Sequence, residues 1–223
     1  MPKSKKRVHC LEEGCADVGF TVLGPIQNNV YFIDDGEGLI MVDPSCLPDD
    51  IMACVGDRNV DAIFITHNHW DHCNGLAEVK RRTGAPVIAS KVDSPVIEAG
   101  QKDMGIVTEG CVVDRKVSDG DIIAVGKTEW RVIATPGHTP GGICFFLDPQ
   151  KAPHPDRRPL LVSGDTLFCG SIGRTDFEGG SMRDMRASLA RLSKLPDSTI
   201  VLPGHNALTT IQVEQKRVFS YYR

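Results

Sequence analysis

The segment Thr66-His67-Asn68-His69-Trp70-Asp71-His72 decides how the rest of this 223-residue chain is interpreted. It places three imidazoles and a carboxylate directly after the apolar run 62–65, which has the composition of a buried strand. Imidazole and carboxylate are ligand types that zinc, iron and manganese share. One segment that supplies four of them can serve two metal ions. The sequence therefore predicts a metal centre at the end of a strand.

Ligand-type side chains follow three further apolar runs in the same way. They are His138 in Thr135-Pro136-Gly137-His138-Thr139, Asp165 in Ser163-Gly164-Asp165-Thr166, and His205 in Leu202-Pro203-Gly204-His205. A lone His or Asp at a turn usually does no more than form a hydrogen bond to the backbone. Of the 7 histidines in the chain, however, all except His9 and His154 belong to this recurring arrangement. The recurrence favours one shared metal centre over four unrelated turns.

Length and charge limit the classes of function. A chain of this size forms one large domain or two small ones, and a single domain over 1–223 is the simpler expectation. The formal net charge of -4 predicts no nucleic-acid partner, and the basic run Lys3–Arg7 is expected to be a solvated tail. No apolar stretch is long enough for a signal peptide or a membrane span, which predicts a cytoplasmic protein without a membrane partner. The 8 cysteines are accordingly expected to be reduced. The oligomeric state is not predicted.

Strands and helices are expected to alternate along the chain. Strands are predicted at 20–23, 29–34, 39–42, 61–65, 86–89, 112–117, 121–125, 129–134, 142–147, 160–163 and 199–202. Helices are predicted at 48–57, 71–82 and 182–193, the first opened by Pro48 and the second ended by Gly84. Residues 91–111 have poor periodicity and predict a short helix and a loop that borders the site as a substrate lip.

Taken together, HNHWDH, GH, GD and PGH resemble the motif set of the metallo-β-lactamase superfamily over nearly the whole chain. The resemblance implies an α/β protein, a four-layer αβ/βα sandwich with the metals at one edge between two β-sheets. It also implies two divalent metal ions, with zinc expected first and iron or manganese as alternatives. The implied ligands are His67, His69 and His138 for the first ion, Asp71, His72 and His205 for the second, and Asp165 as the bridge between them.

Within the superfamily, the segment 164–181, GDTLFCGSIGRTDFEGGS, is similar to the glyoxalase II branch and its smaller bacterial relatives. The ending 203–206 with Thr209-Thr210 is similar to them too, although Asn206 stands where they often carry Gly or Glu. Full-length glyoxalase II has a helical C-terminal domain that helps to hold glutathione, whereas residues 206–223 alone follow His205 here. Recognition of glutathione is therefore in doubt, while the hydrolytic centre is not.

The resemblance implies hydrolysis of a small-molecule thioester of the hydroxyacylglutathione type. A metal-bridging hydroxide is the expected nucleophile, because metal binding lowers the pKa of water to about 7. The leaving thiolate needs no dedicated acid. Asp71 and Asp165 are the expected catalytic carboxylates, and Asp71 can also take the proton of the hydroxide. Arg174 either contacts a substrate carboxylate or pairs with Asp176 to fix its loop.

A persulfide dioxygenase of the same fold is the alternative, because that branch also carries an Arg-Thr-Asp-Phe segment, here 174–177. It would hold a single iron with His67, His138 and Asp165, a site open to oxygen. That branch usually ends closer to Pro-Ala-His, so Gly204 favours hydrolysis. β-Lactam or lactone hydrolysis has no supporting motif. A metal-storing protein would be expected to lack a ligand, and a nuclease needs a basic surface that this composition does not provide.

Overall fold

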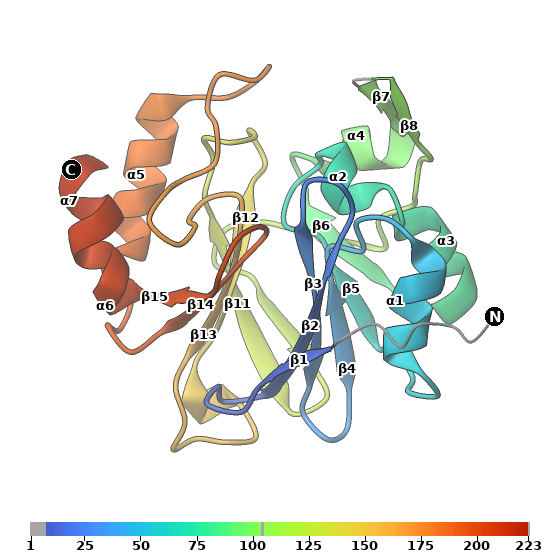
Figure 1. Cartoon of the computed structure of the whole chain (residues 1–223), viewed down its shortest axis with the longest axis horizontal. Coiled ribbons are helices and arrows are strands. Elements are labelled where there is room, and N and C mark those ends of the chain that lie inside the picture. Colours follow the sequence, from blue (N-terminus) through green and yellow to red (C-terminus); the bar gives the residue numbers. More distant parts are fainter. Residues whose placement is uncertain (1–7, 104, 223) are drawn as a thin grey trace.

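The first sheet of the computed structural model, which describes residues 8–103 and 105–222, joins an N-terminal meander to parallel strands (Figure 1). In spatial order its strands are β1 (His9–Leu11), β2 (Asp17–Leu23), β3 (Asn28–Asp34), β4 (Leu39–Val42), β5 (Ala62–Phe64), β6 (Val87–Ser90) and β9 (Arg115–Val117). The strands from β1 to β4 pair antiparallel, and those from β4 to β9 pair parallel. Because parallel neighbours end at the same edge, Asp43 after β4 and the histidine-rich segment after β5 emerge together. The basic run Lys3–Arg7 lies outside the described residues.

The second sheet brings the remaining ligand-type residues to one edge. In spatial order its strands are β10 (Ile122–Val125), β11 (Thr128–Ala134), β12 (Ile143–Leu147), β13 (Leu160–Gly164), β14 (Ile200–Pro203) and β15 (Thr209–Thr210). Strands β10 to β13 pair antiparallel in sequence, whereas β13 and β14 pair parallel. Strands β11, β13 and β14 therefore run in the same direction. His138, Asp165 and His205, which follow these strands, consequently lie at the same edge of the sheet.

Helices cover the outer face of each sheet (Figure 1). The first sheet carries α1 (Pro48–Val55), α2 (Trp70–Cys73), α3 (Leu76–Thr83) and α4 (Ser94–Ala99), and the second carries α5 (Met182–Leu192), α6 (Ile211–Glu214), the π-helical η2 (Gln215–Phe219) and α7 (Ser220–Tyr222). One hydrophobic cluster fills the space between the sheets. A second lies between the first sheet and its helices, and a third lies between the second sheet and its helices. The predicted four-layer αβ/βα sandwich is therefore confirmed. Within the described residues, no helix is both long and apolar enough to span a membrane.

Phe64, at the end of β5, lies at the centre of the core between the sheets. Its ring stacks on Phe145 at a centroid distance of 4.5 Å and meets Trp130 edge-on at 5.9 Å. We expect Phe64→Ala to lower the free energy of unfolding by about 3–5 kcal/mol, because two sheets held by their own hydrogen bonds cannot close the cavity. Urea denaturation measures this loss as a lower midpoint at unchanged slope. Tyr221→Ala, which truncates a ring that is 76% exposed, is the control and should shift the midpoint little.

The predicted helix 71–82 is wrong as a single helix, since the structure divides it into α2 and α3. The break occurs at Gly75, whose N–H donates to the carbonyls of Pro44 and Ser45 at 3.0 and 2.8 Å. A Cβ at this position would come within 2.6 Å of the Pro44 carbonyl oxygen. A tertiary contact with the loop after β4 thus overrides the local helical pattern.

Residues 91–111 contain more regular structure than the predicted short helix and loop. After α4 the chain forms a small hairpin of β7 (Gln101–Asp103) and β8 (Ile106–Thr108). The predicted strand 112–117 shortens to β9, because its first residues serve as the connection from the hairpin. Some short elements were not predicted, namely β1, the 3₁₀ turn η1 (Pro149–Lys151) and the helices after residue 210. Elements of three to five residues give too few positions for a periodic pattern, and the helical type changes twice along 211–222.

Candidate metal centre

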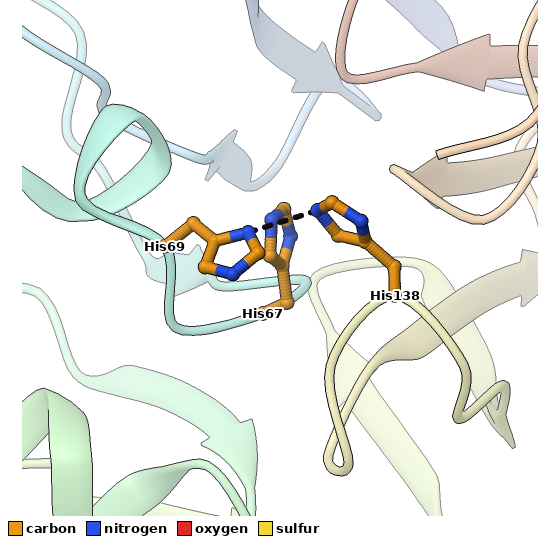
Figure 2. Close-up of side chains that lie close together, drawn as sticks. All are labelled: His67, His69 and His138. Carbon is orange, nitrogen blue, oxygen red and sulfur yellow. Dashed lines mark hydrogen bonds between the residues drawn. The ribbon is translucent and has the colours of Figure 1, made fainter. Parts of the chain in front are cut away.

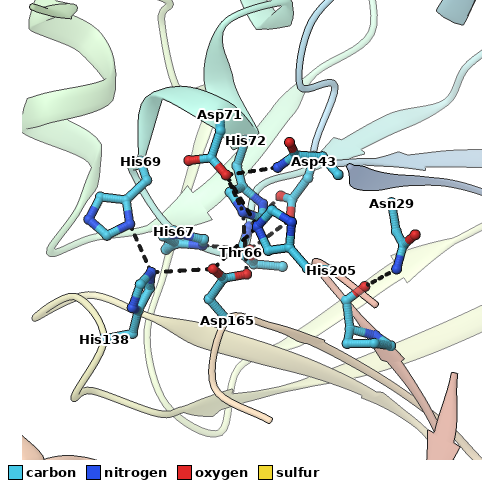
Figure 3. Close-up of polar contacts among 12 residues, drawn as sticks. Asn29, Asp43, Thr66, His67, His69, Asp71, His72, His138, Asp165 and His205 are labelled. Atoms are coloured by element: carbon cyan, nitrogen blue, oxygen red, sulfur yellow. Dashed lines mark hydrogen bonds and ion pairs between the residues drawn. The ribbon is translucent and has the colours of Figure 1, made fainter. Parts of the chain in front are cut away.

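The seven predicted ligands meet where the two sheets approach each other (Figure 3). The loop after β5 and the start of α2 supply four of them, and the loops after β11, β13 and β14 supply one each. In chain order they are His67, His69, Asp71, His72, His138, Asp165 and His205. The centre thus lies across the seam between the sheets, with ligands from both sides.

His67, His69 and His138 form the first group, and their rings meet edge-on (Figure 2). One ring nitrogen of each lies within 4.8 Å of the other two. Nδ1 of His69 is 2.8 Å from Nε2 of His138. Burial, helped by the neighbouring histidines, lowers the pKa of His67 well below its ordinary value and that of His69 to about 4. Neutral imidazoles offer a lone pair, which is the form that binds a metal.

Asp71, His72 and His205 form the second group (Figure 3). Oδ2 of Asp71 lies 3.3 Å from Nε2 of both His72 and His205. Burial acts to raise the pKa of the Asp71 carboxyl, but the two rings outweigh burial and hold it well below its usual range. Burial likewise acts to lower the pKa of His205, yet Asp165 and Asp71 raise it to about 9. The carboxylates therefore favour positive charge here, which a divalent cation can supply in place of protons.

Asp165 lies between the two groups. Its Oδ1 is 3.3 Å from Nε2 of His72, and its Oδ2 is 3.5 Å from Nε2 of both His138 and His205. Gly204 packs directly against it, because a Cβ there would come within 2.4 Å of Asp165 Oδ1. The carboxylate therefore occupies the place that a bridging ligand requires.

Three buried polar atoms at this centre have no hydrogen-bond partner within the described part of the chain. They are Nε2 of His67, Nε2 of His72 and Oδ1 of Asp165. An unsatisfied buried polar group costs about 1–3 kcal/mol, so a folded protein normally satisfies it. All three atoms belong to predicted ligands, and divalent cations would satisfy them. The residues present therefore fit a centre for two metal ions, although imidazole and carboxylate do not select among zinc, iron and manganese.

Asp43 supports this centre and was not predicted from the sequence. Its Oδ2 lies 2.9 Å from Nδ1 of His72 and accepts a hydrogen bond of 2.7 Å from the Thr66 hydroxyl (Figure 3). The contact with Nδ1 leaves Nε2 of His72 facing Asp71 and Asp165. Asp43 has a φ of 48°, a backbone conformation that non-glycine residues rarely adopt and that is most often retained at functional sites. Asp43 directly follows β4, as the predicted ligands follow their strands. This position could have identified Asp43 from the sequence.

Further contacts orient the remaining ligands. Asn28 donates through Nδ2 to Asp71 Oδ2 at 2.8 Å. The Nδ1–H groups of His138 and His205 donate to backbone carbonyls at 2.6 and 3.1 Å, respectively, which directs Nε2 of each ring to the centre. Asn206, the departure noted in the sequence, has a φ of 66°, a conformation that Asn tolerates better than most residues. No sequence signal marked Asn28, because a strand-opening asparagine is common.

Arg174 pairs with Asp176, which is one of its two predicted roles. Its Nε and Nη2 donate to the Asp176 carboxylate at 2.9 and 2.8 Å, and its guanidinium lies 4.2 Å from the centre of the Phe177 ring. Phe177 in turn meets His69 edge-on at 5.5 Å. The pair thus holds the ring that forms a wall of the centre, and a contact between Arg174 and a substrate carboxylate stays a prediction.

The sequence profile of the metallo-β-lactamase superfamily matches residues 23–205 of this chain. The match covers most of the chain and includes every predicted ligand. The chain belongs to the metallo-β-lactamase superfamily. Its relatives in this superfamily include the probable metallo-hydrolase YqgX of Bacillus subtilis, which is 30% identical over 201 residues that cover 86% of this chain and 92% of that protein.

A glyoxalase II-like relationship is also confirmed. The hydroxyacylglutathione hydrolase of Marinomonas sp. is 33% identical over 182 residues, which cover 80% of this chain but 61% of that enzyme. Two solved structures are similar over nearly their whole length. The BLEG-1 B3 metallo-β-lactamase has a TM-score of 0.81 at 29% identity, with 91% of this chain and 98% of that chain covered. TTHA1623 in a di-iron-bound form has a TM-score of 0.74 at 31% identity, with 89% and 97% covered.

Proposed function

We propose that this protein is a hydrolase with a dinuclear metal centre that cleaves a thioester of the hydroxyacylglutathione type. The observation that carries the proposal is the position of Asp165 between two complete ligand groups. Zinc is the metal expected first, with iron or manganese as alternatives. The sequence similarity to a hydroxyacylglutathione hydrolase supports a thioester as the substrate. We place the protein in the cytoplasm, which agrees with the buried thiols of Cys73, Cys111 and Cys144.

The protein's own groups prepare the site for this reaction. When bound, two divalent ions supply a strong nucleophile at neutral pH and draw electrons from the substrate carbonyl. Asn28 holds the Asp71 carboxylate in place, and this carboxylate can accept the proton of the attacking water. Phe177 and Phe168, whose rings lie 5.5 and 5.8 Å from those of His69 and His205, flank the centre with apolar surface. The leaving thiol has an ordinary pKa of about 8.5, so it departs without a dedicated acid.

A persulfide dioxygenase would use His67, His138 and Asp165 for a single iron. That use leaves Asp71, His72 and His205 without a role, although they form a complete ligand group of their own. Retention of the second group supports the hydrolase.

Metal analysis and two assays on one sample test the proposal. Protein purified without added metal should contain about two ions per chain and should hydrolyse S-lactoylglutathione. One iron per chain with oxygen uptake that depends on glutathione persulfide would overturn the proposal in favour of the dioxygenase. Rapid cleavage of a β-lactam without thioester cleavage would contradict the substrate class while keeping the dinuclear centre.

We expect Arg174→Ala to change kcat/KM by less than about fivefold, because an exposed ion pair contributes about 0–1 kcal/mol. The matched variant Asp176→Asn removes the other half of the pair and should have a similar effect. Steady-state kinetics of both variants with an anionic thioester measure this. If Arg174 instead bound a substrate carboxylate, its loss alone would raise KM by tenfold or more, about the cost of a charged hydrogen bond.

A further inference from the structure

Asp93 is a buried carboxylate near the metal centre that belongs to neither ligand group. It follows β6, and 2% of its surface is exposed. Its Oδ2 accepts hydrogen bonds from the N–H of Asn68 at 3.1 Å and from the hydroxyl of Thr139 at 2.9 Å. The N–H of Gly141 donates to the same carboxylate. A single oxygen atom of Asp93 thus joins two separate segments of the chain.

These two segments carry the first ligand group. Asn68 lies between His67 and His69, in the loop after β5 of the first sheet. Thr139 directly follows His138, in the loop after β11 of the second sheet. The hydrogen bonds of Asp93 therefore cross the same seam that the three histidine rings cross.

The surroundings of Asp93 hold its carboxylate in one place. Its own N–H donates to the Ser90 hydroxyl at 3.0 Å, and the Ser94 hydroxyl donates to the Ser90 carbonyl at 2.6 Å. Gly141 packs so closely that a Cβ there would come within 2.2 Å of Asp93 Oδ1. The carboxylate has little freedom to move without displacing the loops it contacts.

Asp93 occupies the cap position of α4, where an aspartate ordinarily accepts a hydrogen bond from its own helix. Among the described residues, however, its side chain makes no such capping bond. The carboxylate instead turns to the loops of the first ligand group. Burial of a carboxylate is costly unless hydrogen bonds compensate, so this orientation indicates a role in holding these loops.

We propose that Asp93 is a positioning residue that fixes the distance between the His67–His69 loop and the His138 loop, and with it the metal affinity of the first group alone. The inference rests on the proposed metal centre. The second group has a separate support, since Asn28 contacts Asp71 and Asp43 contacts His72. Loss of Asp93 should therefore weaken one site and spare the other.

Calorimetric titration of the metal-free protein with Zn²⁺ tests this inference. Two binding steps are expected, and His69→Ala and His205→Ala identify the step that belongs to each group. Asp93→Ala removes both carboxylate oxygens, so the Asn68 N–H and the Thr139 hydroxyl both lose their acceptor. We expect the step that is lost in His69→Ala to weaken by about tenfold or more, as is typical for a residue behind a ligand, with the other step unchanged.

Asp35→Ala is the matched control. Asp35 is also a buried aspartate that accepts three backbone hydrogen bonds, from Glu37, Gly38 and Lys127. It lies in the turn between β3 and β4, at the end of the first sheet opposite the metal centre. This variant should lose folding stability while both zinc-binding steps keep their affinity.

Thr139→Val and Thr139→Ser provide a second test if Asp93→Ala fails to fold. Valine removes the hydroxyl and should weaken the first step, whereas serine keeps the donor and should restore it. The inference is overturned if Asp93→Ala weakens neither step or both equally, or if Asp35→Ala has the same effect. If His69→Ala and His205→Ala leave both steps intact, the ligand assignment itself fails and takes the inference with it.

Discussion

His138→Ala is expected to remove one of the two metal ions per chain and to lower thioester hydrolysis by about a thousandfold or more. His138 is the ligand that the second sheet contributes to the first group, and its Nε2 lies 2.8 Å from Nδ1 of His69. Without it, His67 and His69 remain on one loop, and the metal loses a ligand from the opposite side of the seam. Metal polarisation contributes several kcal/mol to the barrier, and each 1.36 kcal/mol corresponds to about tenfold in rate.

Elemental analysis of the purified variant, together with its steady-state rate, measures this effect. His154→Ala is the control, because His154 lies in the proline-rich connection after β12 and its side chain is 35% exposed. The control should keep both ions and full activity. A His138→Ala protein with unchanged metal content and rate would contradict the ligand assignment.

The sequence was sufficient to predict which residues meet at the candidate centre, because these residues follow strands. Strands β11, β13 and β14 end at the same edge, so residues that lie far apart in the sequence, such as His138 and His205, meet there. The spacing of His67, His69, Asp71 and His72 within one segment has the same effect locally. Apolar strands with a polar residue after them are a local pattern, and local patterns are visible in one sequence.

The supporting residues were harder to predict because their roles depend on contacts between distant segments. Asp93 has the sequence context of a helix cap, yet its carboxylate contacts Asn68 and Thr139. Asn28 opens a strand, and its contact with Asp71 depends on where the β2–β3 hairpin meets the second ligand group. Gly75 likewise ends α2 through a contact with residues that lie about thirty positions earlier. Such partners follow from the packed fold and from no local pattern.

The two ligand groups also differ in the residues that hold them in place. The first group depends on a contact across the seam through Asp93, whereas the second is held by Asn28 and by Asp43, which also contacts Thr66 beside His67. Within the described part of the chain, Asp165 is the one carboxylate whose two oxygens face both groups. Removal of this one carboxylate should therefore affect the whole centre, unlike removal of any single histidine.

Asp165→Ala is expected to lose both ions and with them the thermal stability that metal binding adds. A ligand present at a hundred times its Kd stabilises a folded protein by about 2.7 kcal/mol, which corresponds to roughly 5–10 °C in Tm for a chain of this size. Differential scanning calorimetry with and without zinc should show this rise for the wild type and none for the variant. Asp176→Ala, which removes an exposed carboxylate beside the centre, is the control and should keep the full rise.

Retention of one ion by Asp165→Ala would show that this carboxylate serves a single site. The bridging geometry would then be wrong, because a true bridge contributes to both sites at once. In that case the proposed hydrolase would have to act with one metal. The metal content of His205→Ala, which removes a ligand of the second group, would then show whether that site is independent. The two variants together therefore distinguish a shared dinuclear centre from two independent sites. The distances around Asp165 favour the shared centre.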